Sequence, residues 1–431
     1  MANSKNKPLI DLADVVFDRL GCHVHPGQRL CVAFSGGIDS VALLHATVDA
    51  SRRLNIPQPT ALHVHHGLSP HADEWAAFCR KTCERLGVEL QIRQVEVRSE
   101  GDGIEGAARK ARHAQFDAVN ADWVLLGHHL DDQAETVLLN LLRGAGVHGA
   151  SGMAERRGRL LRPLLKTSRD EISAYAIQQS LQWIDDESNV DTNYSRNFLR
   201  HTILPTLEER FSQSRANLAR AAQSFEATAQ LLDEVAVEDL QDAKRLNVAQ
   251  LAPLSPVRAL NLLAYYLRQH GVRISSSASL NELLNQLLNA GCDSEIRFTM
   301  GQWEIRRFHN EVWVEKPQLA VSPVMWDGRE AVPWGGYRIQ TRATLGEGIT
   351  TSLLAEETLR FTARCGGEML QLSDNGPRRP LKDWLREAGI PPWRRKTLPL
   401  LFAGEELVWV GGIGVAAKYR CKPGAAGFSI E

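Results

Sequence analysis

The chain has 431 residues, a hydrophobic share of 43% and a formal net charge of −1. This length predicts two or three domains, and the near-neutral charge excludes a protein that coats nucleic acid through a uniformly basic surface. No stretch approaches about 18 uncharged apolar residues, so no membrane span is expected. Seven scattered cysteines, an odd number, argue against a secreted disulfide scaffold. We therefore expect a reduced, cytoplasmic protein.

The first 200 residues alternate short apolar runs with longer amphipathic segments. Strands are expected at 29–34, 61–64, 88–97 and 123–126, and helices at 41–54, 71–86, 104–120 and 130–142. Alternation at this spacing predicts an α/β fold with an open parallel sheet and right-handed crossovers. Ligands of such sheets bind outside the carboxyl ends of the strands.

After Pro205 the pattern changes to helices followed by short strands. A single helix is expected over 207–245, then helices at 260–267, 280–288 and 381–388, and strands at 296–300, 303–308 and 311–315 with a turn at His309 and Asn310. The predicted domains are 1–215 (parallel sheet), 216–316 (mainly helical) and 346–431 (small, α+β), with a Pro-, Gly- and Trp-rich linker at 317–345.

Residues 35–40, Ser-Gly-Gly-Ile-Asp-Ser, lie between a predicted strand and helix. Two glycines let the backbone approach an anion, and the helix amino end and serine hydroxyls add donors. The segment is neither a Walker A loop nor a dinucleotide turn. A carboxylate beside phosphates requires a bridging cation, so Asp39 predicts Mg²⁺. The alternative is an ordinary glycine turn with an N-cap Ser or Asp; the preceding strand and Asp39 favour phosphate binding.

Two polar clusters follow other predicted strands. The first contains His63, His65 and His66, for which a structural or nucleotide-contacting role is favoured over a metal site because no carboxylate or cysteine partner is near in sequence. The second, residues 127–136, places Asp132 and Glu135 on adjoining faces of one helical turn. Such acids could hold Mg²⁺, recognise a cationic substrate or deprotonate an amine, or could simply cap the helix.

The segments 35–40, 63–68, 107–112, 127–136, 141–144, 162–165, 186–189, 196–200, 381–384 and 390–394 resemble, in this order, those of the tRNA(Ile)-lysidine synthases. This family belongs to the N-type ATP pyrophosphatase (PP-loop) superfamily, and the resemblance covers nearly the whole chain in its long, three-domain form. It implies an adenine-nucleotide α-hydrolase-like fold for the first domain. It also implies a ligase that adenylates carbon 2 of the wobble cytidine of tRNA(Ile) with a CAU anticodon and then attaches free lysine, switching decoding from AUG to AUA.

The resemblance assigns roles to individual residues. It implies that ATP is bound by Ser35, Gly36, Gly37, Ile38, Asp39, Ser40, His65, Arg109, Arg112 and His129, with Asp39 on Mg²⁺. Lysine would be bound by Asp132 and Glu135, which with Asp39 are the implied catalytic residues. The tRNA would be bound by Arg196, Asn197, Arg200, Arg378, Arg379, Lys382 and Arg394. Pro380 after Arg378 and Arg379 departs from the usual family pattern, and whether the enzyme is a homodimer stays open.

Three other functions fit the sequence less well. A tRNA thiolase of the same superfamily would need paired catalytic cysteines or a C-x-x-C motif, and this chain has no C-x-x-C. An amidotransferase-type synthetase for NAD or GMP acts on a small molecule and would not need the two further C-terminal domains. A tRNA-binding module with an inactive ATP site is disfavoured by the presence of Asp39, Asp132 and Glu135.

Overall fold

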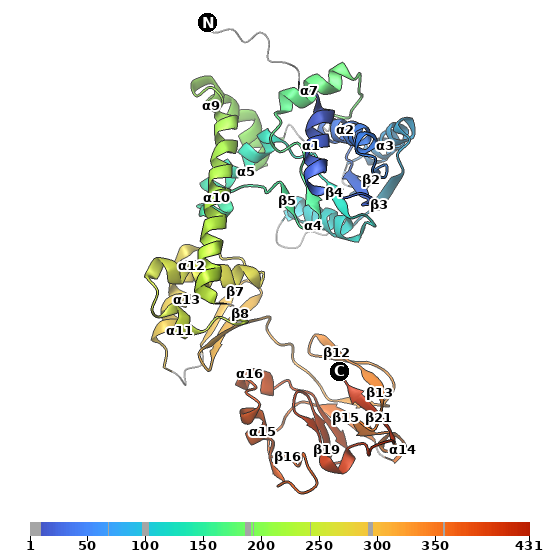
Figure 1. Ribbon diagram of the computed structural model, residues 1–431, viewed down its shortest axis with the longest axis vertical. Coiled ribbons are helices and arrows are strands. Elements are labelled where there is room, and N and C mark those ends of the chain that lie inside the picture. The colour runs from blue at the N-terminus through green and yellow to red at the C-terminus, as the bar shows by residue number, and fades with distance from the viewer. Residues whose placement is uncertain are drawn as a thin grey trace. The chain divides into compact units, whose positions relative to one another are not determined.

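The computed structural model describes residues 10–67, 69–96, 103–185, 191–192, 194–241, 243–291, 296–356 and 358–431. The chain divides into two compact units, one ending at Leu232 and one beginning at Asp233, so the division falls within helix α10 (Ser214–Leu240). Each unit is described by itself (Figure 1). Residues 186–189, one of the segments that carry the family resemblance, lie outside the described residues.

The first unit contains a six-stranded sheet in the order β3-β2-β1-β4-β6-β5. Its strands are β1 (Leu30–Ala33), β2 (Thr60–His65), β3 (Leu90–Gln94), β4 (Trp123–Leu125), β5 (Arg156–Arg157) and β6 (Leu160–Leu161). All pairs are parallel except β5 with β6. The predicted α/β fold with a parallel sheet is therefore confirmed.

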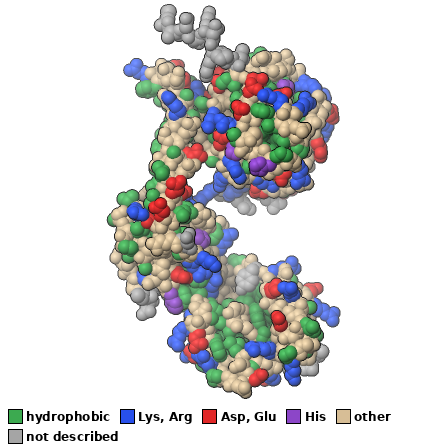
Figure 2. Space-filling view, in the orientation of Figure 1, with side chains coloured by type: hydrophobic (Ala, Val, Ile, Leu, Met, Phe, Trp, Pro, Cys, Tyr) green, Lys and Arg blue, Asp and Glu red, His purple; other side chains and the backbone are tan. Residues whose placement is uncertain are grey.

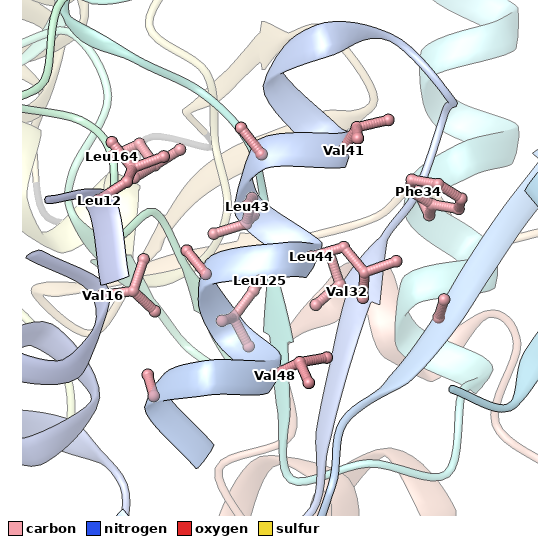
Figure 3. Close-up of a cluster of buried hydrophobic side chains, with 14 of the residues drawn as sticks. Leu12, Val16, Val32, Phe34, Val41, Leu43, Leu44, Val48, Leu125 and Leu164 are labelled. Carbon is pink, nitrogen blue, oxygen red and sulfur yellow. The ribbon is translucent and has the colours of Figure 1, made fainter. Parts of the chain in front are cut away.

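Helices pack on both faces of this sheet because the side chains of its central strands β1 and β4 are apolar on both sides. The helices up to residue 178 are α1 (Leu12–His23), α2 (Ile38–Leu54), α3 (Ala72–Leu86), α4 (Gly103–Ala118), α5 (Leu130–Leu142), α6 (Val147–Ala150) and α7 (Arg169–Gln178). Val32 and Leu125 pack with Leu44 of α2 and with α1 on one face (Figure 3). Cys31 and Leu62 pack with Phe116 of α4 on the other, as strand alternation requires.

The strand order places β1 and β4 side by side at the centre. From β1 the chain runs outward through β2 to β3 and then returns to β4 on the opposite side of β1. The order therefore reverses between β1 and β4, which is the point where open α/β sheets form their binding crevice. Residues 35–40 follow β1 and residues 127–136 follow β4, so the two strongest sequence motifs meet at this point.

The single helix predicted over 207–245 is wrong. The chain instead forms α8 (Ser195–Phe198), a π-helical turn η2 (Leu199–Ile203), α9 (Leu204–Arg210) and α10, with a break at 211–213. Gln213 adopts a left-handed φ of 64°, which interrupts the helix. The Glu208 carboxylate accepts hydrogen bonds from the Ser214 hydroxyl (2.6 Å) and the Arg215 amide (3.4 Å), which caps the new helix start. Apolar periodicity alone does not detect such a local cap.

The second unit begins with helices and a three-stranded antiparallel sheet around one core. The elements are α11 (Val248–Leu251), α12 (Pro256–Gln269), α13 (Ser277–Asn289), β7 (Arg297–Met300), β8 (Trp303–Phe308) and β9 (Glu311–Glu315). Leu263, Leu283 and Ile305 lie in its centre. His309 and Asn310 form the predicted turn between β8 and β9, and both have positive φ.

The rest of this unit is mainly antiparallel. Its elements are β10 (Val324–Trp326), β11 (Val332–Trp334), β12 (Tyr337–Ile339), β13 (Thr341–Leu345), β14 (Ile349–Thr350), α14 (Leu353–Glu356), β15 (Leu359–Thr362), β16 (Met369–Leu370), β17 (Arg379–Pro380), α15 (Leu381–Glu387), α16 (Pro392–Arg395), β18 (Leu400–Ala403), β19 (Glu406–Val410), β20 (Gly414–Val415), the 3₁₀ turn η3 (Ala417–Tyr419) and β21 (Ala426–Ile430). Trp326 and Trp334 of the segment predicted as a linker pack in the same core as Phe361. The domain boundaries stay a prediction. No helix within the described ranges is long and apolar enough to cross a membrane.

Candidate active site at the carboxyl ends of β1 and β4

The loop between β1 and α2 is tightly hydrogen-bonded to itself. Ser40 Oγ accepts from the Gly36 amide (3.1 Å) and donates to the Gly37 carbonyl (2.9 Å). Gly36 has a φ of 90°, and a Cβ at this position would come within 2.9 Å of Ile184, so only glycine fits. Gly37 caps α2 without a side-chain hydrogen bond, and Asp39 is the second helical residue. The ordinary capping alternative therefore does not explain Asp39.

Asp39 is partly buried among charged groups, with 27% of its side chain exposed. Its Oδ2 lies 3.2 Å from the Arg169 guanidinium and its Oδ1 lies 3.7 Å from His129 Nε2. Burial raises the pKa of Asp39, and His129 and Arg169 oppose this shift. Oδ1 is buried and accepts no hydrogen bond. An oxygen left without a donor beside a phosphate loop fits a hard cation such as Mg²⁺.

The described residues contain no group of three or more His, Cys, Asp and Glu side chains that could hold a metal by themselves. Mg²⁺ does not require such a group, because it is commonly held by one or two carboxylates with phosphate and water oxygens as its other ligands. Asp39 is the residue that fits this role.

Gly127 allows the loop after β4 to touch the phosphate loop. A Cβ on Gly127 would lie 3.2 Å from the Asp39 carbonyl carbon and oxygen and 3.4 Å from the Ser40 amide nitrogen. Any larger residue would press on the backbone that carries Asp39. Gly127 belongs to the motif 127–136, but the motif alone does not predict this contact.

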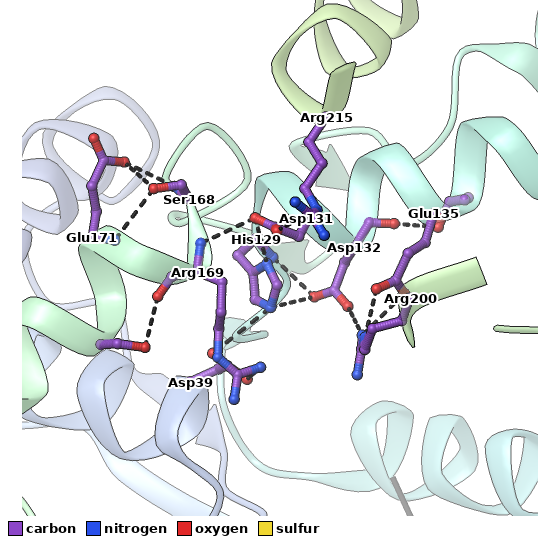
Figure 4. Close-up of polar contacts among 12 residues, drawn as sticks. Asp39, His129, Asp131, Asp132, Glu135, Ser168, Arg169, Glu171, Arg200 and Arg215 are labelled. Carbon is purple, nitrogen blue, oxygen red and sulfur yellow. Dashed lines mark hydrogen bonds and ion pairs between the residues drawn. The ribbon is translucent and has the colours of Figure 1, made fainter. Parts of the chain in front are cut away.

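A cluster of two carboxylates and two arginines lies next to this contact, and Figure 4 labels Asp132, Glu135 and Arg200 of this cluster. Glu135 is only 1% exposed and is bonded by Arg200 Nε (2.5 Å) and Arg196 Nε (2.8 Å). Asp132 Oδ1 accepts from Nη2 of Arg200 (3.0 Å) and Arg196 (3.3 Å), and its Oδ2 accepts from the His129 amide (3.1 Å). Burial raises the pKa of Asp132, but His129 and Arg196 outweigh it, so the net shift is downward. The helix thus brings the two predicted acids together.

Asp131, between His129 and Asp132, faces another direction. Its Oδ1 accepts from the Arg169 amide (3.1 Å), and its Oδ2 lies 3.1 Å from Nε of Arg215. Asp131 therefore ties α5 to α7 and α10, whereas Asp132 faces the arginine pair. Arg169 and Arg215 were not predicted from the sequence, because they are distant in the chain and lie in no motif.

His63 and His65 of β2, and His66 directly after it, lie in three different environments. His63 is buried, and its Nδ1 lies 2.9 Å from the Phe34 carbonyl and 3.5 Å from Cys79 Sγ, which is a structural position. His65 Nε2 lies 3.2 Å from exposed Asp73. Burial lowers the pKa of His66 to about 4, with Arg112 adding to the effect, so His66 is neutral at physiological pH.

The predicted basic residues are dispersed over the molecule. Arg109 and Arg112 are exposed on α4. Asn197 donates to the Asp191 carbonyl (2.9 Å). In the second unit Arg378, Lys382 and Arg394 are exposed, Arg379 pairs with Glu387 (2.5 Å) and Arg394 pairs with Glu315 (2.5 Å). Figure 2 shows Lys and Arg side chains interspersed with Asp and Glu on the visible face, in keeping with the near-neutral charge.

Gln133, to which the sequence pattern assigns no role, organises the neighbouring loop. Its amide group accepts from the Met153 amide (2.7 Å) and donates to the Met153 carbonyl (2.9 Å). Gly152 has a φ of 69°, and a Cβ there would collide with the Gln133 side chain at 2.7 Å. The signal in the sequence was a glutamine in the first turn of α5, which is too common to indicate this contact.

A parallel sheet with a Ser-Gly-Gly-x-Asp-Ser loop at its switch point defines a PP-loop ATP-binding protein. Comparison with known families agrees: the family described as "PP-loop domain" matches residues 12–207, "TilS substrate binding domain" matches 246–313, and "TilS substrate C-terminal domain" matches 359–431.

Relatives over nearly the full length identify the particular family. A tRNA(Ile)-lysidine synthase of Nitrosomonas europaea is 40% identical over 100% of this chain and 97% of its own. The tRNA(Ile)-lysidine synthase of Alkalilimnicola ehrlichii is 41% identical over 93% of each chain. That of Ralstonia nicotianae is 42% identical over 89% of this chain and 88% of its own. The chain belongs to the tRNA(Ile)-lysidine synthase family and is an ATP-using enzyme of the PP-loop class.

Proposed function

We propose that this enzyme forms lysidine at the wobble cytidine of tRNA(Ile) with a CAU anticodon, in two steps. The oxygen on carbon 2 of the cytosine attacks the α-phosphorus of ATP, and pyrophosphate leaves. The ε-amine of free lysine then attacks carbon 2, AMP leaves with that oxygen, and the amine gives up a proton. The observation that carries the proposal is the meeting of the phosphate loop with the Asp132–Glu135 cluster at one switch point.

The ATP half of the reaction is assigned to the loop after β1. Backbone amides at the amino end of the 17-residue helix α2 supply partial positive charge for the phosphates. Asp39, with its free Oδ1, would hold Mg²⁺, which neutralises phosphate charge when bound. Arg169 lies close enough to Asp39 to turn to the same phosphates. Arg109, Arg112, His65 and His129 stay proposed nucleotide contacts.

The lysine half is assigned to Asp132 and Glu135. The two carboxylates form ion pairs with Arg196 and Arg200. A lysine ε-ammonium, with an ordinary pKa of about 10.4, would have to displace one of these guanidinium groups to reach Glu135. Arg196 and Arg200 were predicted to bind tRNA, and a displaced guanidinium would be free to do so. Which acid takes the proton of the amine stays open.

Binding of tRNA is assigned to the exposed basic side chains of the second unit. Arg378 and Lys382 are exposed near the start of α15 and have no ion pair among the described residues. Replacing both with alanine should raise the Km for tRNA about tenfold and reduce the slope of log affinity against log salt by roughly 2, because each lost phosphate contact releases about one counterion less. An unchanged salt slope would reject these contacts.

The rival thiolase function would need reactive thiols. Burial raises the pKa of Cys79 to about 12 and of Cys83 to about 11, and both lie in the hydrophobic core beside α2. Thiols of this kind are inert packing groups. Cys79 and Cys83 therefore give no support to a thiolase function.

The decisive measurement is incorporation of radiolabelled lysine into a tRNA(Ile) transcript with a CAU anticodon. Incorporation should require ATP and Mg²⁺ and should release AMP and pyrophosphate in equal amounts. A transcript with a UAU anticodon serves as the control and should accept no label. Formation of AMP and pyrophosphate with the CAU transcript but without lysine incorporation would reject the proposal and leave only RNA adenylation.

A further inference from the structure

Arg162 is a buried cation that the mechanism above does not use. It follows β6 in the first unit and is only 6% exposed. Its Nη1 donates to the Ala154 carbonyl (2.8 Å) and its Nε donates to Nδ1 of His128 (3.3 Å). Among the described residues no carboxylate lies within ion-pair distance of it. A buried arginine is normally paired with an acid. A buried arginine that instead donates a hydrogen bond to a histidine therefore needs an explanation.

The Arg162–His128 hydrogen bond has only one possible direction. A guanidinium group has donors and no acceptor, so Nδ1 of His128 must accept. Burial lowers the pKa of Arg162 to about 10, with Arg157 and Arg109 adding to the shift, and the group is still charged at neutral pH. A histidine that accepts at Nδ1 is neutral and carries its proton on Nε2.

The surroundings of His128 also keep the imidazole neutral. Burial lowers its pKa to about 3. Positive charges on Arg162, on Arg196 of α8 and on Arg109 of α4 disfavour protonation, whereas Asp132 of α5 favours it. The three arginines and the burial prevail over the single acid.

The position of His128 places this tautomer at the reaction site. It lies in the loop after β4, next to Gly127, which touches the phosphate loop. Its side chain is partly exposed, whereas Arg162 behind it is buried. Nδ1 of His128 is therefore hydrogen-bonded to the buried Arg162, and Nε2–H is the donor left for a ligand.

We propose that Arg162 is a positioning residue that fixes His128 as a neutral Nε2–H donor toward an oxygen of the nucleotide adenylate. The nature of this ligand rests on the proposed function; the tautomer does not. A neutral imidazole can stabilise developing negative charge as a hydrogen-bond donor without transferring its proton. The same tautomer prevents His128 from serving as the base for lysine, which leaves that role to the carboxylates.

The tautomer can be observed directly by nitrogen NMR of the full-length protein with ¹⁵N-labelled histidine, using His128→Gln to assign the signals. We expect Nδ1 of His128 in the wild type to be unprotonated and Nε2 to be protonated. Arg162→Met should give a mixture of tautomers and a higher pKa of His128, with partial rescue by Arg162→Lys. His45, whose Nδ1 lies 2.8 Å from the Tyr175 hydroxyl, is the internal control and should not change. A wild-type Nδ1 that carries the proton would overturn the proposal, whether or not any variant folds.

Activity then tests whether Arg162 acts through His128. Arg162→Met should lower kcat for lysine incorporation about 10- to 100-fold, as is usual for a partner that orients a functional histidine, with the Km for ATP little changed. His128→Ala should cost at least as much, and the double variant should be no worse than His128→Ala. Additive losses would overturn the positioning role and indicate that Arg162 contacts the substrate by itself.

The two proposals fail in different ways. If the enzyme incorporates no lysine but His128 shows the Nε2–H tautomer lost in Arg162→Met, the proposed function fails and the positioning pair stands. If lysine is incorporated but the tautomer is wrong or insensitive to Arg162, the pair fails and the function stands.

Discussion

Two buried glutamates in this protein are each hydrogen-bonded to a pair of arginines. Glu135 in the first unit is bonded by Arg196 and Arg200, and Glu304 in the second unit, 5% exposed, is bonded by Arg297 and Arg306. Each carboxylate accepts hydrogen bonds from two guanidinium groups. By charge and burial alone, the two sites would be given the same role.

The difference lies in what surrounds each pair. The arginines of Glu304 are two and seven residues away and come from its own hairpin, β7 and β8, so the cluster is local and closes on itself. Those of Glu135 are 61 and 65 residues away. They meet it at the switch point of the sheet, beside Asp132 and the unsatisfied oxygen of Asp39. A buried ion pair is therefore weak evidence for function until its place in the fold is known.

The largest expected effect separates the two glutamates directly. Glu135→Gln should reduce lysine incorporation by about 10³-fold, because a neutral amide neither binds an ammonium group strongly nor accepts its proton. Glu304→Gln should leave kcat within about twofold. Both rates are measured with the same CAU transcript. Equal losses of activity in the two variants would contradict the conclusion that only Glu135 has a role in the reaction.

The second expected effect concerns the phosphate loop. Asp39→Ala should lower the rate of pyrophosphate release by about 10²-fold or more, since the residue proposed to hold Mg²⁺ beside the phosphates is lost. Asp49→Ala on the same helix removes an exposed carboxylate that pairs with Arg53 and serves as the control. Unchanged pyrophosphate release in Asp39→Ala would mean that this carboxylate holds no metal.

Neighbouring acids on α5 sharpen the comparison further. Asp132→Asn should raise the Km for lysine about tenfold, because Asp132 shares the arginine pair with Glu135. Asp131→Asn should leave that Km within about twofold, because Asp131 faces Arg215 and the Arg169 amide. Steady-state kinetics with varied lysine distinguish them. The reverse order would show that the ligand approaches from the Asp131 side.

Glu304 should matter for stability instead. Hydrogen bonds from Arg306 and Arg297 outweigh burial and lower its pKa. Its contribution is therefore present above the unfolded pKa of about 4.3 and is lost as the pH falls through the folded-state value. Arg297 is 63% exposed, so Glu304→Gln should cost only about 1 kcal/mol, or roughly 3 °C in Tm at pH 7. The difference in Tm from wild type should begin to narrow below about pH 4 and close once the pH is below the lowered folded-state pKa; a difference that persists there would have another origin.

The smallest expected effect is a gain in stability rather than a loss. Burial raises the pKa of Asp39, so its charge disfavours the folded state at neutral pH, and protonation removes this cost as the pH falls. Asp39→Asn should therefore raise Tm by about 1 °C at pH 7 while pyrophosphate release is lost, and the gain should vanish below about pH 4. Calorimetry without nucleotide measures it. A lower Tm at pH 7 would mean that Arg169 and His129 fully stabilise the carboxylate.

Much of the first unit could be predicted from its sequence because parallel strands buried on both faces leave a strong apolar signal. The strand predicted at 29–34 and the helix predicted at 130–142 correspond to β1 and α5. The break before α10 was missed, since it depends on one left-handed residue and a capping carboxylate rather than on periodicity. Predictions of single residues for ATP, lysine and tRNA stay predictions.

The sequence by itself determined the kind of chemistry and the order of its parts. The loop 35–40 between strand and helix indicated phosphate binding, and the acids three residues apart on one helix had to share a turn. Tertiary structure alone decided which of the adjacent acids Asp131 and Asp132 meets Arg196 and Arg200, and that Arg162 binds His128 across 34 residues of chain. The physical reason is that periodicity reports the burial of one element, whereas charge partners are chosen by the packing of elements far apart in the chain. The phosphate loop could be recognised from consecutive residues, whereas the residues that contact it could not.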